Sequence, residues 1–235
     1  MSFSKIGIIG AMVEEIELLH QNVSNISETI KAGVTYYSGT LHGIDVIYCK
    51  SGVGKVNAAI CTQVLLSMGV EAVWFTGVAG ALNPSLEVGD IVISSSALQH
   101  DMDVTPLGFA KGEIPFQEVS DFSADASLIA LAQRVGEALF PNHVLVGKIV
   151  SGDQFIASRD KVTELYGQFE GACVEMEGAA VAQVCYANEI PFVIIRSMSD
   201  KADGSADVTY QEFVVTAANN SYAIIDGMLT ELTKA

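Results

Sequence analysis

The alternation of short apolar segments with segments of helical periodicity is the feature that most restricts how this chain can fold. The predicted strands are 5–10, 34–39, 44–50, 72–77, 90–97, 144–150, 172–175 and 191–198. The predicted helices are 12–20, 54–68, 123–140, 158–166 and 178–188, followed by a last helix after 209. Strands that alternate with helices predict a mostly parallel, twisted sheet that is covered on both faces.

Turn and cap residues predict where several of these elements begin and end. His42-Gly43, after Leu41, indicates a hairpin, and the glycines and proline of 77–84 indicate a loop. Ser123 is expected to cap one helix, and Thr209 with Glu212 forms a capping box for the last one. Residues 99–122 lack periodicity and predict a long loop, which in a compact domain is usually functional. With no repeat or linker, one domain over 1–235 is expected.

The charge balance argues against polyanionic partners. Twelve Lys and Arg residues stand against 28 Asp and Glu, which gives a formal net charge of −16. Nucleic acids and anionic membranes both require a basic surface, so neither is an expected partner. The four cysteines have no metal-ligand spacing and lie in apolar runs, which favours a reducing cytoplasm. No signal peptide and no membrane span are predicted.

Ionisable groups gather where the predicted strands end. In a sheet of this kind, ligands bind outside the carboxyl ends of the strands. The segments expected at that edge are 12–15, 77–80, 152–156, 175–177 and 196–200. Four of the five segments carry a carboxylate, and an Arg lies in the last. Their convergence predicts a site, although no single member does.

Each of these groups also has a structural interpretation. Glu14 and Glu15 fit the first turn of a helix, where negative charge is stabilised by the dipole. Arg196 is harder to explain in this way, because an Arg in an apolar strand needs a carboxylate partner. The Gly-rich stretch 7–10 lacks the complete dinucleotide fingerprint. Residues 100–103 resemble metal ligands but have no second cluster, so neither a cofactor nor a metal is predicted.

The motifs IGIIGAMVEE, SGVGKVNAA, TGVAGAL, VGDIVIS, SGDQFI, VEMEGAAVAQVC and RSMSDKAD, with an aromatic at Tyr210, together resemble a known family. The chain is similar to methylthioadenosine/adenosylhomocysteine nucleosidases of the purine nucleoside phosphorylase superfamily, over nearly its whole length from Lys5. The resemblance implies a three-layer α/β/α fold around a central mixed, largely parallel twisted sheet. It also implies a homodimer that hydrolyses the N-glycosidic bond of small adenine nucleosides.

The same resemblance implies catalytic roles. Adenine leaves readily only when protonated at N7, and Asp200 matches the family's general acid. Glu15 matches the base that activates water, and Glu177 matches the residue that holds the ribose hydroxyls and stabilises an oxocarbenium-like transition state. Glu175 and Arg196 match groups that orient Glu177. Ser199 is expected to position Asp200.

The remaining pocket is also implied by the resemblance. Phe155 is expected to stack on adenine while the Ile156 backbone binds its edge. The other lining residues are expected to be Met12, Val53, Val78, Ala79, Gly80, Met176 and Tyr210. The residues expected to reach across a dimer and cover the alkylthio tail are Val104, Leu107, Phe109 and Pro115. Val13, Val78 and Leu107 stand where the family commonly has an acidic residue, a Ser and an aromatic.

The residues also bear on four other functions. A phosphorylase needs converging cations for phosphate, but the chain has three arginines, and Phe75 stands where related phosphorylases carry one. The same lack of cations argues against an AMP nucleosidase. A non-catalytic nucleoside-binding protein would not need Glu15, Glu177 and Asp200 together. Cleavage of 5′-deoxyadenosine or of a futalosine-type nucleoside stays open.

Overall fold

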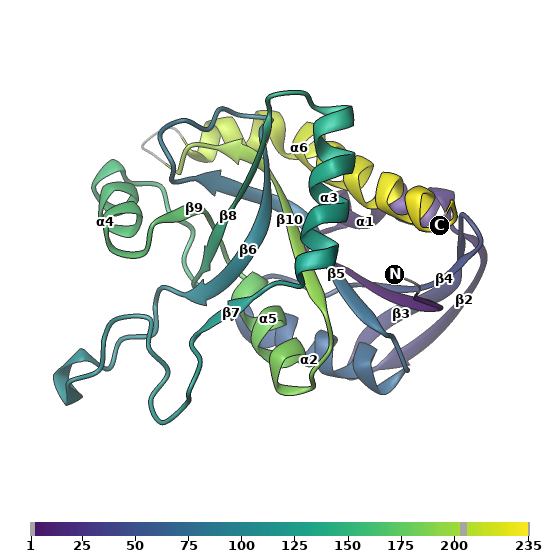
Figure 1. The fold of residues 1–235 in the computed structure, drawn as a ribbon, viewed down its shortest axis with the longest axis horizontal. Coiled ribbons are helices and arrows are strands. Elements are labelled where there is room, and N and C mark those ends of the chain that lie inside the picture. Colours follow the sequence, from purple (N-terminus) through teal and green to yellow (C-terminus); the bar gives the residue numbers. More distant parts are fainter. Residues whose placement is uncertain (1–2, 203–205, 235) are drawn as a thin grey trace.

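The strands join in one ten-stranded mixed sheet in the computed structural model, which describes residues 3–202 and 206–234 (Figure 1). The strands are β1 (Lys5–Gly10), β2 (Ser24–Lys31), β3 (Val34–Leu41), β4 (Ile44–Lys50), β5 (Ala72–Ala81), β6 (Ile91–Gln99), β7 (Asp121–Ser123), β8 (Val144–Ser151), β9 (Gly171–Glu175) and β10 (Phe192–Asp200). Their order is β10-β6-β8-β9-β5-β1-β4-β3-β2, with β7 beside β6 and an additional pairing of β10 with β5. One half of the sheet therefore closes on itself.

The central strands alternate large apolar side chains between two buried faces. In β1, Ile6 and Ile8 point to one hydrophobic cluster and Ile9 to the other. In β5, Trp74 and Phe75 divide in the same way. A strand that is buried on both faces must be apolar at every position, which is why these segments read as continuous apolar runs.

Helices cover both faces, as the three-layer prediction requires. The helices are α1 (Val13–Asn22), α2 (Lys55–Ser67), α3 (Ala126–Leu139), α4 (Arg159–Phe169), α5 (Gly178–Ala187) and α6 (Ala206–Leu232). α1, α3 and α6 pack on one face, and α2 and α5 pack on the other (Figure 1). The predicted α/β class is confirmed. No helix in the described ranges is long and apolar enough to span a bilayer.

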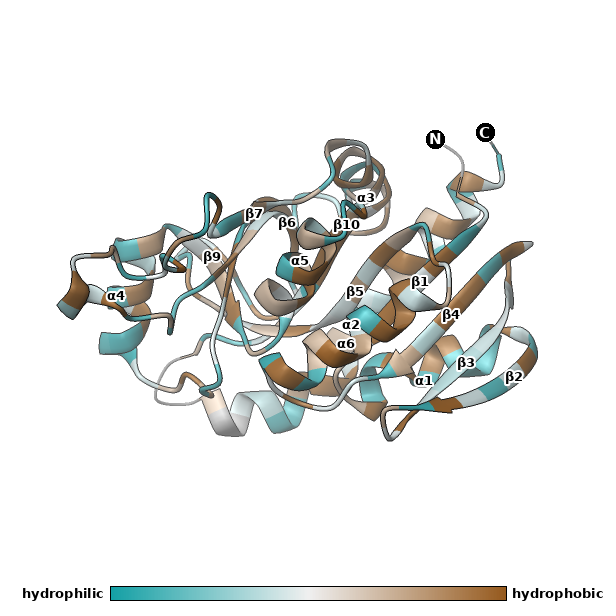
Figure 2. Cartoon of the chain, turned by 90° about the horizontal axis from the view of Figure 1, so that it is seen from below, coloured by the Kyte–Doolittle hydropathy of each residue, from teal (hydrophilic) through white to brown (hydrophobic). Residues whose placement is uncertain are grey.

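The strand β2 was not predicted from the sequence. It is the outermost strand of the sheet, and all eight of its residues are exposed. An edge strand without a buried face has no alternation of apolar and polar residues to reveal it. Hydrophilic segments are visible along it in Figure 2.

Two predicted helix starts and one predicted loop are wrong. Ser123 ends β7, and the cap of α3 is Asp125, whose Oδ1 accepts the N–H groups of Ser127 and Leu128 at 2.9 and 3.0 Å. Thr209 lies inside α6, which already includes Ala206. The first part of the predicted 77–84 loop is strand, because β5 continues to Ala81. Hydrogen bonding to neighbouring strands outweighs the local glycine signal there.

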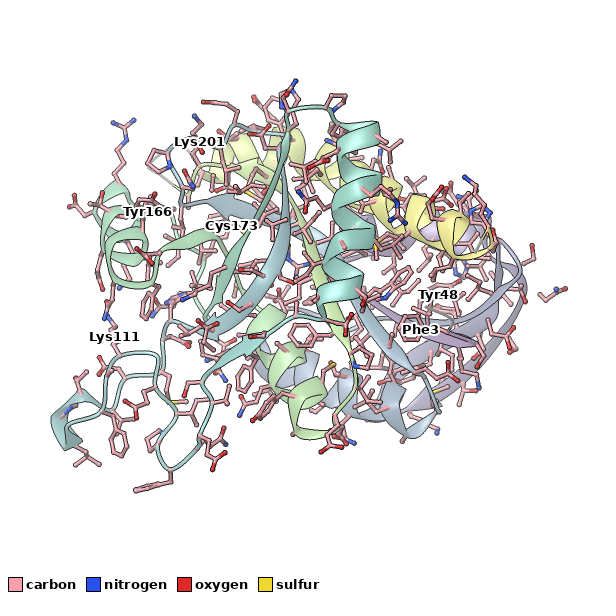
Figure 3. The ribbon with its side chains drawn as sticks, viewed as in Figure 1. Phe3, Tyr48, Lys111, Tyr166, Cys173 and Lys201 are labelled. Carbon is pink, nitrogen blue, oxygen red and sulfur yellow. The ribbon has the colours of Figure 1, made fainter. Side chains whose placement is uncertain are left out.

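The long loop between β6 and β7 projects away from the rest of the chain (Figure 1). A short 3₁₀ helix, Thr105–Leu107, interrupts it. Lys111 lies below α4 in Figure 3, and its Nζ is 2.9 Å from Glu164 Oε1 of that helix. The loop is therefore tied to the body at its middle, while Leu107 and Phe116 remain 76% and 96% exposed.

Candidate active site

A cavity of about 230 Å³ opens at the ends of β1, β5, β9 and β10. Its lining residues are Ala11, Met12, Glu15, Val53, Val78, Ala79, Gly80, Gln154, Phe155, Ile156, Val174, Glu175, Met176, Glu177, Ser199, Asp200 and Tyr210. The predicted carboxylates thus share one mostly apolar cavity, as a binding site for a small molecule requires. No Lys or Arg appears among these lining residues.

Glu15 is buried at the N-terminus of α1, and its carboxylate folds back onto the backbone. Its Oε2 accepts the N–H groups of Ala11 and Met12 at 2.6 and 3.0 Å, and its Oε1 accepts the N–H of Val78 at 3.1 Å. Burial raises the pKa of Glu15, while the Arg196 charge and these three N–H groups lower it. The net rise makes this carboxylate a better proton acceptor than an exposed one.

Glu175 lies at the centre of a buried polar network. Its Oε2 is 2.7 Å from Nη2 of Arg196, which confirms the prediction that this Arg pairs with a carboxylate of the set. The same side chain accepts the N–H groups of Glu177 and Gly178 and the hydroxyl of Ser151. Arg196 also stacks on Phe75, with its guanidinium carbon 3.9 Å from the ring centre. Arg196 thus lies behind the cavity wall rather than on it.

Glu177 begins α5 and faces the cavity. Its Oε1 accepts the N–H of Gly54 at 2.7 Å, at the N-terminus of α2. Burial and the neighbouring Glu175 raise the pKa of Glu177 to about 8, although the Gly54 N–H and Arg196 lower it. A pKa of about 8 favours the protonated form of this carboxyl group at neutral pH, and a positive charge developing nearby would favour the carboxylate.

Asp200 ends β10 and is also buried. Its Oδ2 accepts the hydroxyl of Ser199 at 2.8 Å, and its Oδ1 accepts the N–H of Ala202 at 2.7 Å. The register of β10 against β5 shifts between Met198 and Asp200, and this bulge brings Asp200 opposite Gly80. Bulges of this kind re-aim a side chain at the end of a strand.

Two glycines of β5 allow these side chains to approach the strand. A Cβ on Gly77 would lie 2.5 Å from Glu15 Oε1 and 3.0 Å from Nη1 of Arg196. A Cβ on Gly80 would lie 2.9 Å from Asp200 Oδ1. The glycines of the GVAG stretch therefore make room for the carboxylates, and a side chain at either position would displace one.

Aromatic and thioether groups lie at the cavity mouth. Tyr210 of α6 donates its hydroxyl to Met12 Sδ at 2.9 Å. Its ring meets Phe155 edge to face, with centroids 5.8 Å apart. Phe155 is 52% exposed, so one of its faces is available to a planar ligand.

The predicted site residues divide into two groups. Apart from Arg196, all those predicted outside the 99–122 loop line the cavity. The residues expected to cover the tail, Val104, Leu107, Phe109 and Pro115, lie on the projecting loop and do not line it. Ala11, Gln154 and Val174 line it without having been predicted. Each is adjacent in sequence to a predicted residue, and that adjacency was the available signal.

The described residues contain no group of three or more His, Cys, Asp or Glu side chains arranged to hold a metal ion. The four cysteines are buried free thiols. The arrangement instead places carboxylates on several sides of one small cavity, with a buried Arg behind them. Carboxylates on opposite sides of a bound molecule suit acid–base chemistry.

Comparisons with known proteins agree on the nature of this chain. The family model of the phosphorylase superfamily matches residues 5–230 of this chain. The 5′-methylthioadenosine/S-adenosylhomocysteine nucleosidase of Haemophilus influenzae (strain PittEE) is 43% identical over 230 residues, which cover 97% of this chain and 100% of that protein. Its name describes an enzyme that cleaves nucleosides.

Two solved structures are closely similar. The 5′-methylthioadenosine/S-adenosylhomocysteine nucleosidase of Neisseria meningitidis, in complex with methylthio-immucillin-A, has a TM-score of 0.93 and 40% identity, over 97% of this chain and 99% of that one. The futalosine hydrolase of Helicobacter pylori strain 26695 has a TM-score of 0.92 and 34% identity, over 97% of this chain and 98% of that one.

Proposed function

Since the chain belongs to the phosphorylase superfamily and, within it, to the 5′-methylthioadenosine/S-adenosylhomocysteine nucleosidases, we propose that it hydrolyses the N-glycosidic bond of these two nucleosides to adenine and the thioribose product. The observation that carries the proposal is the meeting of Glu15, Glu177 and Asp200 in one cavity without a lining cation.

In the proposed reaction, Asp200 gives a proton to N7 of adenine. The Ser199 hydroxyl donates a hydrogen bond to Oδ2 of the same carboxyl group and so orients it. As the bond from N9 to C1′ breaks, its electrons stay on adenine and positive charge develops on the ribose. The Glu177 carboxylate, which accepts a hydrogen bond from the Gly54 N–H, stabilises that charge and accepts hydrogen bonds from the ribose hydroxyls.

Glu15 completes the reaction by accepting a proton from water. The water oxygen forms the new bond to C1′, so the product carries a hydroxyl there and the proton resides on Glu15. The raised pKa of Glu15 favours this transfer. Burial without a lining cation favours water over phosphate, because an anion beside this carboxylate would be repelled.

The apolar cavity mouth supports the assignment of the base. Phe155 offers an exposed ring face for stacking on adenine, and the backbone of buried Ile156 follows it. Val53, Val78 and Met176 supply apolar lining for the rest of the nucleoside. In this proposal no cofactor takes part, and the buried free thiols suit a reducing cytoplasm.

We further propose that the active unit is a homodimer in which the 99–122 loop covers the neighbouring cavity. Leu107 and Phe116 project from this loop at 76% and 96% exposure. Val56 and Ile60 of α2 are exposed as well, at 70% and 43%. Large apolar side chains exposed in this number mark an interface or a ligand cover.

Futalosine-type nucleosides are the second candidate substrates, favoured by the similarity to the futalosine hydrolase structure. A panel of purified protein against methylthioadenosine, adenosylhomocysteine, 5′-deoxyadenosine and a futalosine-type nucleoside tests the proposal. We expect fastest base release from the two thioether nucleosides, with none above background from the Asp200→Asn variant. Release restricted to the futalosine-type nucleoside would replace the proposed substrate class.

A further inference from the structure

Three segments that are distant in sequence meet beside the cavity in a closed ring of hydrogen bonds. Lys55 Nζ is 2.5 Å from Asp101 Oδ1. The N–H of Asp153 donates to Asp101 Oδ2 at 3.0 Å, and the N–H of Lys55 donates to Asp153 Oδ1 at 2.8 Å. The ring thus joins the start of α2, the start of the 99–122 loop and the loop after β8.

The surroundings of this ring show that it is more than a surface ion pair. The Lys55 and Asp101 side chains are 17% and 20% exposed, against 42% and 69% for the pair of Lys201 with Glu87. Burial acts to raise the pKa of Asp101, but the hydrogen bonds from Lys55 and from the Asp153 N–H outweigh it and lower that pKa. Partly buried charged hydrogen bonds of this kind are stronger than exposed ones.

A second contact of Lys55 extends the ring toward α5. Its Nζ also donates to Gln99 Oε1 at 2.9 Å, and Gln99 Nε2 donates to Gln183 Oε1 at 2.6 Å. Gln183 belongs to α5, the helix that Glu177 begins. Lys55 is consequently linked to the helix of a proposed catalytic carboxylate by a route that avoids the cavity.

Two members of the ring, Lys55 and Asp153, are close in sequence to residues of the proposed site. Gly54, adjacent to Lys55, donates its N–H to Glu177 Oε1 at 2.7 Å. Asp153 lies two residues before Phe155. α2 has no cap from its own Gly54, and the Asp153 side chain supplies that acceptor from another segment. Any movement of the ring would therefore move both the Gly54 N–H and the loop that carries Phe155.

Gly152 shows how closely the third segment is packed. A Cβ at this position would overlap His100 Nε2 and lie 3.1 Å from Cγ of Asp101. The loop after β8 therefore approaches the side chains of His100 and Asp101 as closely as a glycine permits. The ring and this packing fix the direction in which the 152–156 segment leaves β8.

We propose that Lys55 and Asp101 are positioning residues, which lock the adenine-binding segment 152–156 to the N-terminus of α2 and so couple base stacking to the setting of Glu177. The inference rests on the proposed function. It adds two residues that do not line the cavity and that no motif of the sequence had singled out for this role.

The test uses Lys55→Met and Asp101→Asn, with Lys55→Arg as the conservative variant. Loss of one charged hydrogen bond is expected to raise KM for methylthioadenosine and the inhibition constant of adenine about tenfold, with a smaller fall in kcat. The double variant should be little worse than Lys55→Met alone, because that variant has already lost the Lys55–Asp101 contact. Lys55→Arg should recover most of the loss.

Lys111→Met is the matched control, because it removes an ion pair from the same loop at Glu164. It should leave the inhibition constant of adenine unchanged, because the 99–122 loop is proposed to cover the alkylthio tail and not the base. Hydrogen exchange of peptides covering 152–156, measured on the same proteins, should accelerate in Lys55→Met and Asp101→Asn and not in Lys111→Met.

The outcomes separate the two proposals. Absence of base release by the wild-type protein overturns the proposed function, while exchange at 152–156 still tests the ring. The positioning role is overturned if Lys55→Met and Asp101→Asn both keep the exchange rate at 152–156 and the inhibition constant of adenine within about twofold of wild type. A change of that size is below the effect of losing one charged hydrogen bond. Thermal unfolding identifies a variant that has lost its fold, in which case the other single variant and Lys55→Arg decide.

Discussion

The buried carboxylates of the cavity are stabilised in different ways. Glu15 receives three backbone N–H groups, and Glu175 receives N–H groups and the Arg196 guanidinium. Glu177 has the Gly54 N–H and a raised pKa. A buried charge needs such partners, because desolvation costs several kcal/mol per ion. The differences in partners are what allow similar groups to take different chemical roles.

At this scale, Glu15→Gln is expected to lower kcat for adenine release by about 10²–10⁴-fold, the usual contribution of a general base. The amide keeps the size of the side chain but cannot accept the proton from water. Glu14→Gln is the matched control, because Glu14 is exposed and does not line the cavity. Steady-state kinetics of both variants check the assignment, and equal losses would contradict it.

The pH dependence of stability tests the raised pKa of Glu177. The folded state holds this proton up to about pH 8, against an ordinary value of 4.5. The contribution of this bound proton to the free energy of unfolding is therefore complete below pH 4.5 and is lost as the pH rises to about 8. Urea unfolding across this window should show a steeper fall in the free energy of unfolding for wild type than for Glu177→Gln. Parallel curves would show that Glu177 has an ordinary pKa in the fold.

At the scale of elements, the pairing of β5 with β10 places the site. Arg196 is opposite Gly77 in the parallel register, and the bulge after Met198 brings Asp200 opposite Gly80. Asp200 and Arg196 thus both lie on β10, and the glycines of the neighbouring strand β5 leave space for their side chains. The closed half of the sheet holds that spacing from both sides of β10.

Gly77→Ala is expected to lower both stability and turnover. The added Cβ would meet Glu15 Oε1 at 2.5 Å, and overpacking in a core typically costs about 1–3 kcal/mol. Gly167→Ala in α4 is the control, because nothing lies within 4 Å of its Cβ and alanine favours a helix. Thermal unfolding and kcat of the two variants are compared. A stable and fully active Gly77→Ala would contradict the proposed packing of Glu15.

Sequence patterns predicted the elements that are buried and missed those held by other contacts. The apolar runs of β1 and β10 predict strands, because both faces of the sheet are covered. β2 has no buried face to produce a pattern, and the cap at Asp125 depends on where β7 ends. The cavity residues followed from strand ends and family motifs. The Lys55–Asp101 contact joins segments 46 residues apart, which no local pattern reveals.

At the scale of the whole molecule, the projecting loop and the cavity are separate features of one chain. Leu107 and Phe116 point away from the core, and the cavity mouth has its own aromatic pair, Phe155 and Tyr210. The proposed dimer would bring the loop of one protomer to the cavity of its partner and bury these side chains together. Burial of that apolar surface would contribute about 25 cal/mol per Å².

Leu107→Asp is expected to weaken the dimer and raise KM for methylthioadenosine while leaving the bond cleavage intact. Ile30→Asp is the matched control, since Ile30 is 74% exposed, like Leu107 at 76%, but lies on the edge strand β2. Light scattering at assay concentration and steady-state kinetics measure the two effects. A fully active wild-type monomer would contradict the proposed assembly.

The proposed reaction depends on water, activated by a buried carboxylate, as the nucleophile in this cavity. The direct measurement is the rate of adenine release from methylthioadenosine with and without phosphate, together with identification of the sugar product. We expect the same rate at all phosphate concentrations and a free thioribose as product, because no cation lines the described cavity. A rate that rises in proportion to phosphate, with a sugar 1-phosphate as product, would contradict it.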